Sequence, residues 1–172
     1  MHRLTPLVAL MAVALVPAAT AAHAPSVTSD QPDSALEAIV LDDPTLSRAI
    51  GATIEDPGEI DWYRMDLRAG EPLVVGMTAP DAEGGIPATF TLLGPGLPEA
   101  SDIGPEVEQL AAEAGVDGAL AFEPAVDPPR EVHGGLGFIN YGSVRLETPA
   151  DGAYYVAVQA VDPQATGKYV FA

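Results

Sequence analysis

The sequence PADGAYYVAVQAV, residues 149–161, contains the clearest strand signal in the chain. Its first four residues are typical of a turn, because Pro, Asp and Gly adopt the backbone conformations that turns need. Tyr154, Val156 and Val158 then occupy every second position. Since successive side chains of a strand point to opposite faces, this alternation predicts a strand over 153–161 with one buried face.

More short runs of this kind, each bounded by Gly or Pro, lie on either side of that segment. Within 60–67, Tyr63, Met65 and Leu67 form an inward row, and Trp62 is expected wholly or partly in the core, because large aromatic side chains are mostly buried. Many short strands at this spacing indicate an all-β, antiparallel β-sandwich. Ordered structure should begin near 39–41, and the remaining strands are expected over 47–54, 60–67, 73–78, 88–93, 143–147 and 168–172.

Residues 97–142 interrupt this pattern with a long insertion rich in Pro, Gly and acidic residues. We expect it to be irregular, with a flexible Gly-rich loop at 134–137, apart from one short helix that starts at Pro105. The helix should end at Gly115, a natural C-terminal stop. Long loops on small domains are commonly functional or disordered. The apolar residues of the helix repeat with helical spacing: Val107, Leu110, Ala111 and Ala114.

The first 24 residues have the layout of a secretory signal peptide. A basic start at Arg3 precedes the apolar run 7–16, then Pro17 and a series of small residues, which is the order that exported chains share. Cleavage is expected after Ala24, with Ala22 as the alternative. The apolar run of about 10 residues is too short for a membrane-spanning helix, which needs about 20.

Export to the periplasm or the extracellular space follows from this signal. Residues 25–38, rich in Ser, Pro and Asp, are expected as a flexible arm, and residues 39–172 as a single β-sandwich domain. No later apolar stretch is long enough to span a membrane. The sequence stops inside the last predicted strand at Ala172, so we also expect that the natural chain can continue, for example to a C-terminal membrane anchor.

The charge of the chain limits its partners. It carries 25 acidic residues against 7 Lys and Arg, a formal net charge of −18. Such a field repels nucleic acid and anionic lipid head groups, so we expect neither as a partner. It favours cations, basic partners or solubility alone.

Catalytic chemistry has little support in the residues that remain after export. Cysteine is absent and His133 is the only histidine after residue 24, which excludes thiol catalysis and the clustered ligands of zinc or copper sites. Ser143 is the nearest serine after His133, but no G-x-S-x-G motif surrounds it. We therefore expect no enzyme and no catalytic residues.

Several segments follow one another in an order that carries a family resemblance: EIDWYRM (59–65), AG (69–70), LVV (73–75), FTLLGP (90–95), PADGAYYVAV (149–158) and TGKYVF (166–171). Taken in this order, they resemble the bacterial pre-peptidase C-terminal domain family. The resemblance implies a jelly-roll β-sandwich that serves as an accessory module on secreted bacterial proteins. Family members assist binding to carbohydrate, protein fibres or calcium, or act as passive spacers, and the insertion at 97–142 departs from their shorter connection.

Calcium is the one metal that the residues leave open, because it binds carboxylates and carbonyl groups in loops. Acidic clusters occur at 42–43, 55–61 and 81–83, although no D-x-D-x-D-G loop is present. Some calcium-binding members of the resembled family use acidic residues near the start of the domain, which makes Asp42, Asp43 and Asp61 the candidate ligands. The alternative is that these residues are solvated turn acids.

The sequence thus predicts an exported, non-catalytic binding or structural module, with calcium as its candidate ion and a protein or carbohydrate as its partner. One alternative is an accessory subunit of a larger cell-envelope complex that contacts its partners through 97–142. A second alternative is a hydrolase, whose activity would disappear on His133→Ala.

Overall fold

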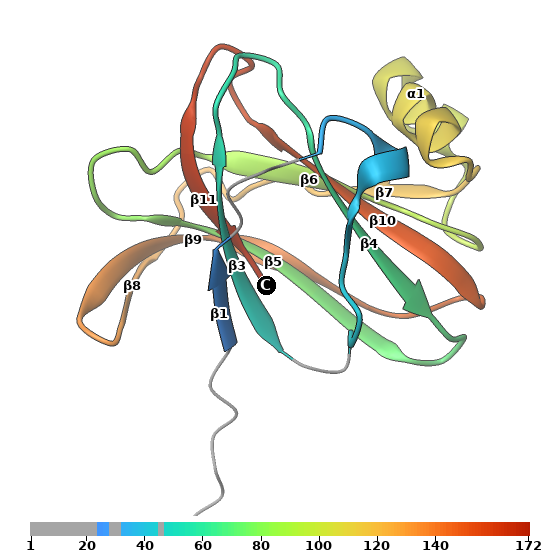
Figure 1. The fold of residues 1–172 in the computed structure, drawn as a ribbon, viewed down its shortest axis with the longest axis horizontal. Helices are drawn as coiled ribbons and strands as arrows, with labels where there is room; N and C mark the ends of the chain where they lie inside the picture. Colours follow the sequence, from blue (N-terminus) through green and yellow to red (C-terminus); the bar gives the residue numbers. More distant parts are fainter. Residues whose placement is uncertain (1–23, 28–31, 45–46) are drawn as a thin grey trace, which may run out of the picture.

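The structure, a computed structural model, describes residues 24–27, 32–44 and 47–172. Within these residues the strands form two sheets that pack face to face (Figure 1). The order across the first sheet is β1 (Ala24–Val27), β3 (Arg48–Ile54), β11 (Gly167–Phe171), β5 (Pro72–Pro80), β9 (Leu136–Glu147) and β8 (Arg130–His133). The order across the second sheet is β2 (Ile39–Val40), β4 (Asp61–Leu67), β10 (Gly152–Ala160), β6 (Ala88–Leu93) and β7 (Ala119–Ala121).

The chain crosses between the two sheets at most of its connections. β3, β11, β5 and β9 lie together in the first sheet, and β4, β10, β6 and β7 lie together in the second. These two groups of antiparallel strands are the arrangement of a jelly roll, and β1 and β2 add parallel strands beside β3 and β4. The prediction of an all-β, antiparallel, jelly-roll-like sandwich is therefore confirmed.

The core between the sheets follows the alternation seen in the sequence. β10 pairs with β4 so that Tyr154 lies opposite Met65 and Val156 opposite Tyr63, and all four side chains are buried. Apolar burial of this kind contributes roughly 25 cal/mol per Å², which makes the inward rows the main source of stability. Other members of the same core include Ile50, Ile54, Val75, Met77, Phe90, Leu92, Tyr169 and Phe171.

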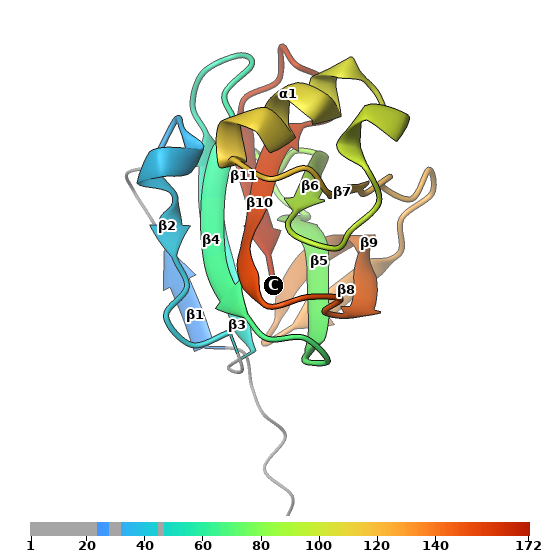
Figure 2. The same cartoon turned by 90° about the vertical axis from the view of Figure 1, so that its right-hand side faces the viewer.

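A second apolar cluster lies on the outer face of the five-stranded sheet, beneath α1 (Pro105–Ala114) (Figure 2). Trp62 is fully buried there, as expected for a core aromatic, beside Leu110 and Ala111 of the helix. The helix begins at Pro105, and Gly115 ends it in the left-handed conformation with φ of 70°. The predicted helix is therefore confirmed with its predicted ends.

Two sequence expectations about irregular segments need correction. The insertion 97–142 contains β7, β8 and the first half of β9 as well as the helix, together with a 3-10 turn at Ala100–Asp102. Gly134 and Gly135 form the turn of the β8–β9 hairpin, so the Gly-rich stretch is not a free loop. Strand signals were weak there because the β8 run is short and glycines interrupt β9.

The arm predicted over 25–38 is also partly regular. Ala24–Val27 pairs with β3, and Ala35–Glu37 forms a 3-10 turn in which Ala35 is buried. The backbone N–H of Ala35 donates to Glu113 on α1 at 3.2 Å, which ties the arm to the helix.

Residues 1–23, which hold most of the predicted signal peptide, lie outside the described residues. No helix among the described residues is long and apolar enough to cross a membrane.

Candidate binding groove

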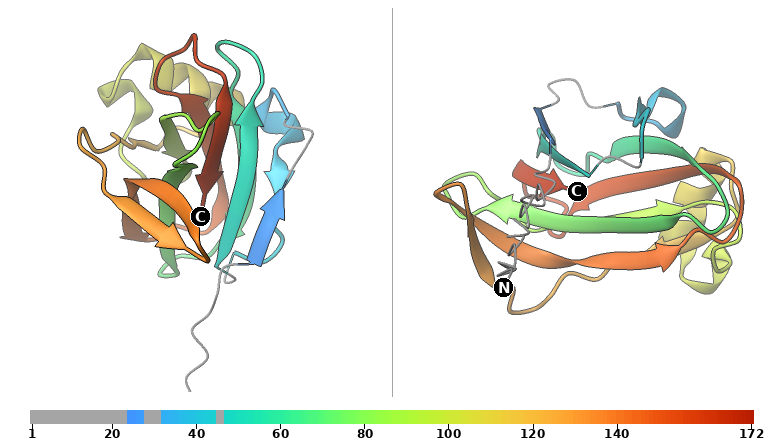
Figure 3. Two further views of the ribbon diagram at one scale, coloured as in Figure 1. Left: turned by 90° about the vertical axis from the view of Figure 1, so that its left-hand side faces the viewer. Right: turned by 90° about the horizontal axis from the view of Figure 1, so that it is seen from below.

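A groove of about 490 Å³ opens at the end of β11. β11 pairs with β5 through Val170 and Phe171, and Ala172 follows with two backbone hydrogen bonds to Gly76, of 2.6 and 3.0 Å. β5 continues beyond this point toward its start at Pro72. Figure 3 (left) looks onto the six-stranded sheet and shows β11 ending inside it. The groove thus lies where β3 and β5 extend past the strand between them.

The walls of the groove combine two kinds of surface. Its floor reaches the sandwich core at Ile50, Leu73 and Val75, and its rim carries polar side chains of β3, β8, β9 and the segment before β3. An apolar floor with a few placed polar groups is the common design of ligand sites, and the volume falls within the roughly 300–1,000 Å³ of such sites. The polar rim residues include Asp43, Arg48, Glu131, His133, Asn140 and Ser143.

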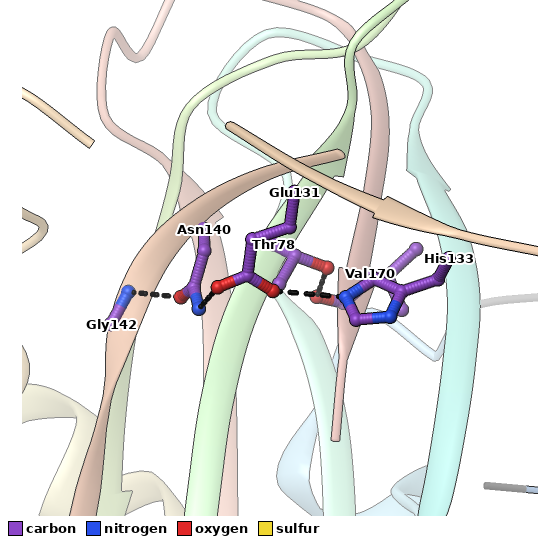
Figure 4. Close-up of polar contacts among 6 residues, drawn as sticks. All are labelled: Thr78, Glu131, His133, Asn140, Gly142 and Val170. Carbon is purple, nitrogen blue, oxygen red and sulfur yellow. Dashed lines mark hydrogen bonds and ion pairs between the residues drawn. The ribbon is translucent and has the colours of Figure 1, made fainter. Parts of the chain in front are cut away.

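Glu131 is the centre of a hydrogen-bonded network at this rim (Figure 4). Its carboxylate accepts a hydrogen bond from Asn140 Nδ2 at 2.8 Å and lies 2.9 Å from His133 Nε2. Asn140 Oδ1 in turn accepts the backbone N–H of Gly142 at 2.9 Å. The network therefore fixes the positions of three side chains on the β8–β9 hairpin.

An irregularity in β9 places Asn140 in this network. The register between β5 and β9 shifts between Met77 and Thr78, so that Met77 lies opposite Gly142 and Thr78 opposite Asn140, with Tyr141 as the extra residue. A bulge re-aims the side chains beyond it. Asn140 thereby shares the outer face with Thr78, whose Oγ1 donates to the carbonyl of Val170 at 3.5 Å.

The electrostatics of the rim are mixed. Hydrogen bonding by Asn140, followed by that of His133, lowers the pKa of Glu131, so this carboxyl stays ionised at neutral pH. Asp43 adds a second acid and Arg48 a cation on the opposite side. Close by, Arg130 pairs with Asp81 at 3.0 Å. The groove can therefore bind polar and positively charged groups at its rim.

The residues considered for nucleophilic catalysis line this same groove but do not form a catalytic unit. His133 is paired with Glu131, and among the described residues no hydrogen bond joins His133 to Ser143. Ser143 lies on β9 well beyond Leu136, the residue opposite His133 at the end of β8. A serine nucleophile needs a histidine within hydrogen-bond reach to take its proton, and this arrangement lacks that contact.

The structure separates the three predicted calcium ligands. Asp42 is exposed, and Asp43 lies half-buried at the groove rim. Asp61, in contrast, is fully buried between the two sheets. The described residues contain no group of three or more His, Asp or Glu that could hold a metal ion. Calcium binding at Asp42, Asp43 and Asp61 stays a prediction.

Asp61 instead belongs to a buried polar chain that links the two sheets. The Tyr169 hydroxyl of β11 donates to Asp61 Oδ2 at 2.5 Å, and the Tyr63 and Tyr169 hydroxyl oxygens are 2.7 Å apart. A hydroxyl has one proton, so Tyr63 is the donor to Tyr169. Burial raises the pKa of Asp61 to about 7, against the hydrogen bond from Tyr169, and the negative charges of Glu59 and Asp33 add to the increase.

The other acidic clusters have structural roles in turns. Glu59 Oε2 accepts the backbone N–H groups of Glu55 and Asp56 at 2.5 and 2.8 Å, which closes the turn between β3 and β4. Asp81 is engaged by Arg130. These contacts favour the interpretation of the clusters as turn acids.

Sequence reasoning identified His133 and Ser143 but missed the roles of Glu131 and Asn140 at the groove. The spacing of Glu131 and His133, two residues apart, would have placed both on one face of a strand. No signal in the sequence could bring β5 and the β8–β9 hairpin together, because their pairing depends on the topology of the whole sheet.

Comparisons with known proteins give distant structural likeness only. No family model and no curated protein sequence matches the chain. One similar solved structure is PliG of Salmonella Typhimurium, a periplasmic inhibitor of g-type lysozyme, with 15% identity over 77% of this chain and 92% of that chain and a TM-score of 0.39. Another is CorA of Methylomicrobium album BG8, a surface-associated copper-binding protein, with 10% identity over 86% of this chain and 98% of that chain and a TM-score of 0.40. Both TM-scores are below 0.5, so neither protein's function is transferred to this chain.

Proposed function

We propose that this protein is an exported, non-catalytic binding module and that the groove is its ligand-binding face. The observation that supports this most is the combination of a floor open to the sandwich core with a rim held in place by the Glu131 network. Groups fixed before binding lose less conformational entropy when a ligand arrives. A groove of this kind is therefore suited to binding.

The chemical class of the ligand follows from charge and from the family resemblance. A net charge of −18 favours a neutral or basic partner. The ordered segments that resemble the pre-peptidase C-terminal domain family support an accessory role on secreted proteins, with a protein or a carbohydrate as partner. Calcium, through Asp42, Asp43 and Asp61, stays an additional prediction that calorimetry during a calcium titration tests.

A second candidate is an accessory subunit of a cell-envelope complex that uses the insertion 97–142 as its contact surface. Four exposed apolar side chains of the insertion favour it: Ile103 beside α1, Val126 in the loop before β8, and Val132 and Leu136 on the β8–β9 hairpin. Single exposed apolar residues are common on protein surfaces, whereas the groove is a built cavity. We therefore place the groove first.

Amide chemical-shift mapping by NMR distinguishes the two faces. The probes are a neutral oligosaccharide, cellohexaose, and a basic peptide, acetyl-VKVKV-amide, each added to the isotope-labelled protein. Binding at the groove should shift the amides of Val74, His133 and Ser143, while those of Glu106 and Glu108 on α1 stay constant. Shifts of the Glu106 and Glu108 amides without shifts of Val74, His133 and Ser143 would contradict the proposal and favour the subunit alternative.

A further inference from the structure

The outer edge of the six-stranded sheet is formed by β8. This strand is the last in the order of its sheet, and among the described residues only β9 pairs with it. The β8–β9 hairpin lies at the periphery of the molecule (Figure 1). An edge strand presents a row of backbone N–H and carbonyl groups to which a strand of another chain can pair.

One hydrogen bond shows which residues of β8 direct their backbone groups outward. The carbonyl of Pro129, just before β8, accepts a backbone N–H of β9 at 2.9 Å. In an antiparallel pair every second residue bonds to the same neighbour, so Glu131 and His133 also bond to β9. The residues between them, Arg130 and Val132, therefore direct their N–H and carbonyl groups to the outer edge.

The side chains of β8 select one register for the antiparallel pairing of two copies. If Arg130 lay opposite Arg130 of the second copy, two like charges would face each other. If Arg130 lay opposite Val132 of the second copy, Glu131 would face Glu131. If Val132 lies opposite Val132, each Glu131 faces His133 of the other copy. Only this last register avoids opposed like charges, which destabilise a strand pair.

The charge of the hairpin also suits contact between two copies. The chain has a net charge of −18, but residues 128–146 contain one acidic residue, Glu131, against Arg130 and Arg145. Two copies that approach along this segment therefore meet less repulsion than along the acidic remainder of the chain. Val132 is 73% exposed, so the contact also removes apolar surface from water.

From these observations we propose that β8 is a self-association edge, at which two copies of the chain pair antiparallel about a two-fold axis at Val132. A two-fold axis makes the interface self-complementary. The two Val132 residues exchange two backbone hydrogen bonds, and their side chains meet on one face of the joined sheet. This inference goes beyond the proposed function, and neither depends on the other.

The opposite face of the joined sheet carries the paired acid and imidazole groups. Glu131 and His133 of the second copy form a pair without mutual backbone hydrogen bonds, in which side chains approach closely. The Glu131 carboxylate already contacts Asn140 at 2.8 Å and its own His133 at 2.9 Å. A carboxylate has about four acceptor positions, so Glu131 can accept a further hydrogen bond from the second copy. Its fixed position reduces the entropy lost on association.

Disulfide trapping tests the register, because the chain contains no cysteine of its own. Residues in a hydrogen-bonded antiparallel pair have Cα atoms about 5.5 Å apart, which lies within the disulfide range of about 4.4–6.8 Å. In a glutathione redox buffer, Val132→Cys should therefore form the covalent dimer with an equilibrium constant at least about tenfold above that of Arg130→Cys. Arg130→Cys is the matched control on the same edge, because its two copies would be four residues out of register, about 13 Å apart.

Sedimentation velocity over a series of protein concentrations tests the association without a covalent bond. An edge of four residues buries less than the roughly 1,200 Å² of a stable interface, so the dimer should be weak and its fraction should rise with concentration. Val132→Lys places like charges opposite each other at the two-fold axis and should abolish the dimer. Val132→Thr, which has nearly the same shape, should preserve it.

A charge exchange tests the paired groups on the other face. His133→Glu places an acid opposite Glu131 and should weaken the dimer at least about tenfold. The double variant Glu131→His with His133→Glu restores opposite partners in the same register and should recover most of the association. Equal weakening in the single and the double variant would contradict the pairing.

Two other results would overturn the inference. Equal trapping of Val132→Cys and Arg130→Cys would mean that the two copies do not meet in this register. A dimer that persists in Val132→Lys would place the interface on another surface. Preferential trapping of Val132→Cys supports the pairing even where sedimentation shows monomer alone, because a disulfide detects weaker association. The groove is tested separately by its ligand-dependent chemical shifts, so failure of one proposal is distinguished from failure of the other.

Discussion

Replacing Asp61 with Asn should change how the stability of the protein depends on pH. The carboxyl of Asp61 is fully buried between the sheets and accepts a hydrogen bond from Tyr169. Burial disfavours its charged form and raises its pKa to about 7 from the ordinary 3.8. Asn has the same shape and can accept the same hydrogen bond, but it does not ionise.

The sign and size of the effect follow from proton linkage. Below pH 3.8 the carboxyl is protonated in the folded and unfolded states alike, so it causes no pH dependence. Between pH 3.8 and 7 the unfolded chain releases this proton while the folded protein keeps it, so the free energy of unfolding falls as pH rises. The loss is complete above pH 7 and amounts to about 4 kcal/mol, because each pKa unit corresponds to about 1.4 kcal/mol.

Urea unfolding of both proteins at intervals between pH 4 and 8.5 measures this difference. The free energy of unfolding of Asp61→Asn, relative to the unmodified protein, should rise by about 4 kcal/mol across this range. Asp127→Asn, a change of an exposed acid, controls for the loss of one charge and should show no such rise. Parallel curves for Asp61→Asn and the unmodified protein would refute the reasoning, since they would mean that Asp61 titrates normally in the folded state.

Three further substitutions test other parts of the structure. A Cβ at Gly94 would clash with the Tyr154 ring, so Gly94→Ala should lower the free energy of unfolding, measured in urea, by about 1–3 kcal/mol. The control Gly76→Ala, whose Cβ makes ordinary contacts, should leave that free energy unchanged. Equal losses in the two variants would contradict the steric explanation. Asn140→Ala removes the largest cause of the lowered pKa of Glu131, so that pKa should rise in an NMR titration, and an unchanged value would show that the hydrogen bond does not form in solution. Gly115 ends α1 with a positive φ, so Gly115→Ala should cost about 1 kcal/mol in thermal unfolding; no loss would mean that the helix ends differently.

Much of the fold could be predicted from the sequence because its signals are local. Alternation at Tyr154, Val156 and Val158 and the bounding Gly and Pro residues located β10, and Pro105 and Gly115 located α1. β8 and the start of β9 were missed because their runs are short, exposed and interrupted by glycine. β9 is specified by its pairing with β5, and β8 by its pairing with β9, and the local pattern contains neither relation.

The candidate site could be predicted only in fragments. Asp61 was grouped with Asp42 and Asp43 through the family resemblance, although its spacing of two residues from Tyr63 and four from Met65 already indicated an inward direction. The groove could not be predicted, since its lining comes from β3, β5, β8 and β9, which are far apart in the sequence. Their arrangement is a property of the whole sheet and lies beyond any single segment.

Site-specific photo-crosslinking in native cells tests the central claim, that the groove is the binding face of an exported module. The photoreactive residue p-benzoylphenylalanine is placed either at Ser143 on the groove rim or at Glu108 on the exposed side of α1. The account predicts a cross-linked partner from position 143 of the exported protein and none from position 108. Cross-links from position 108 with none from position 143 would contradict it.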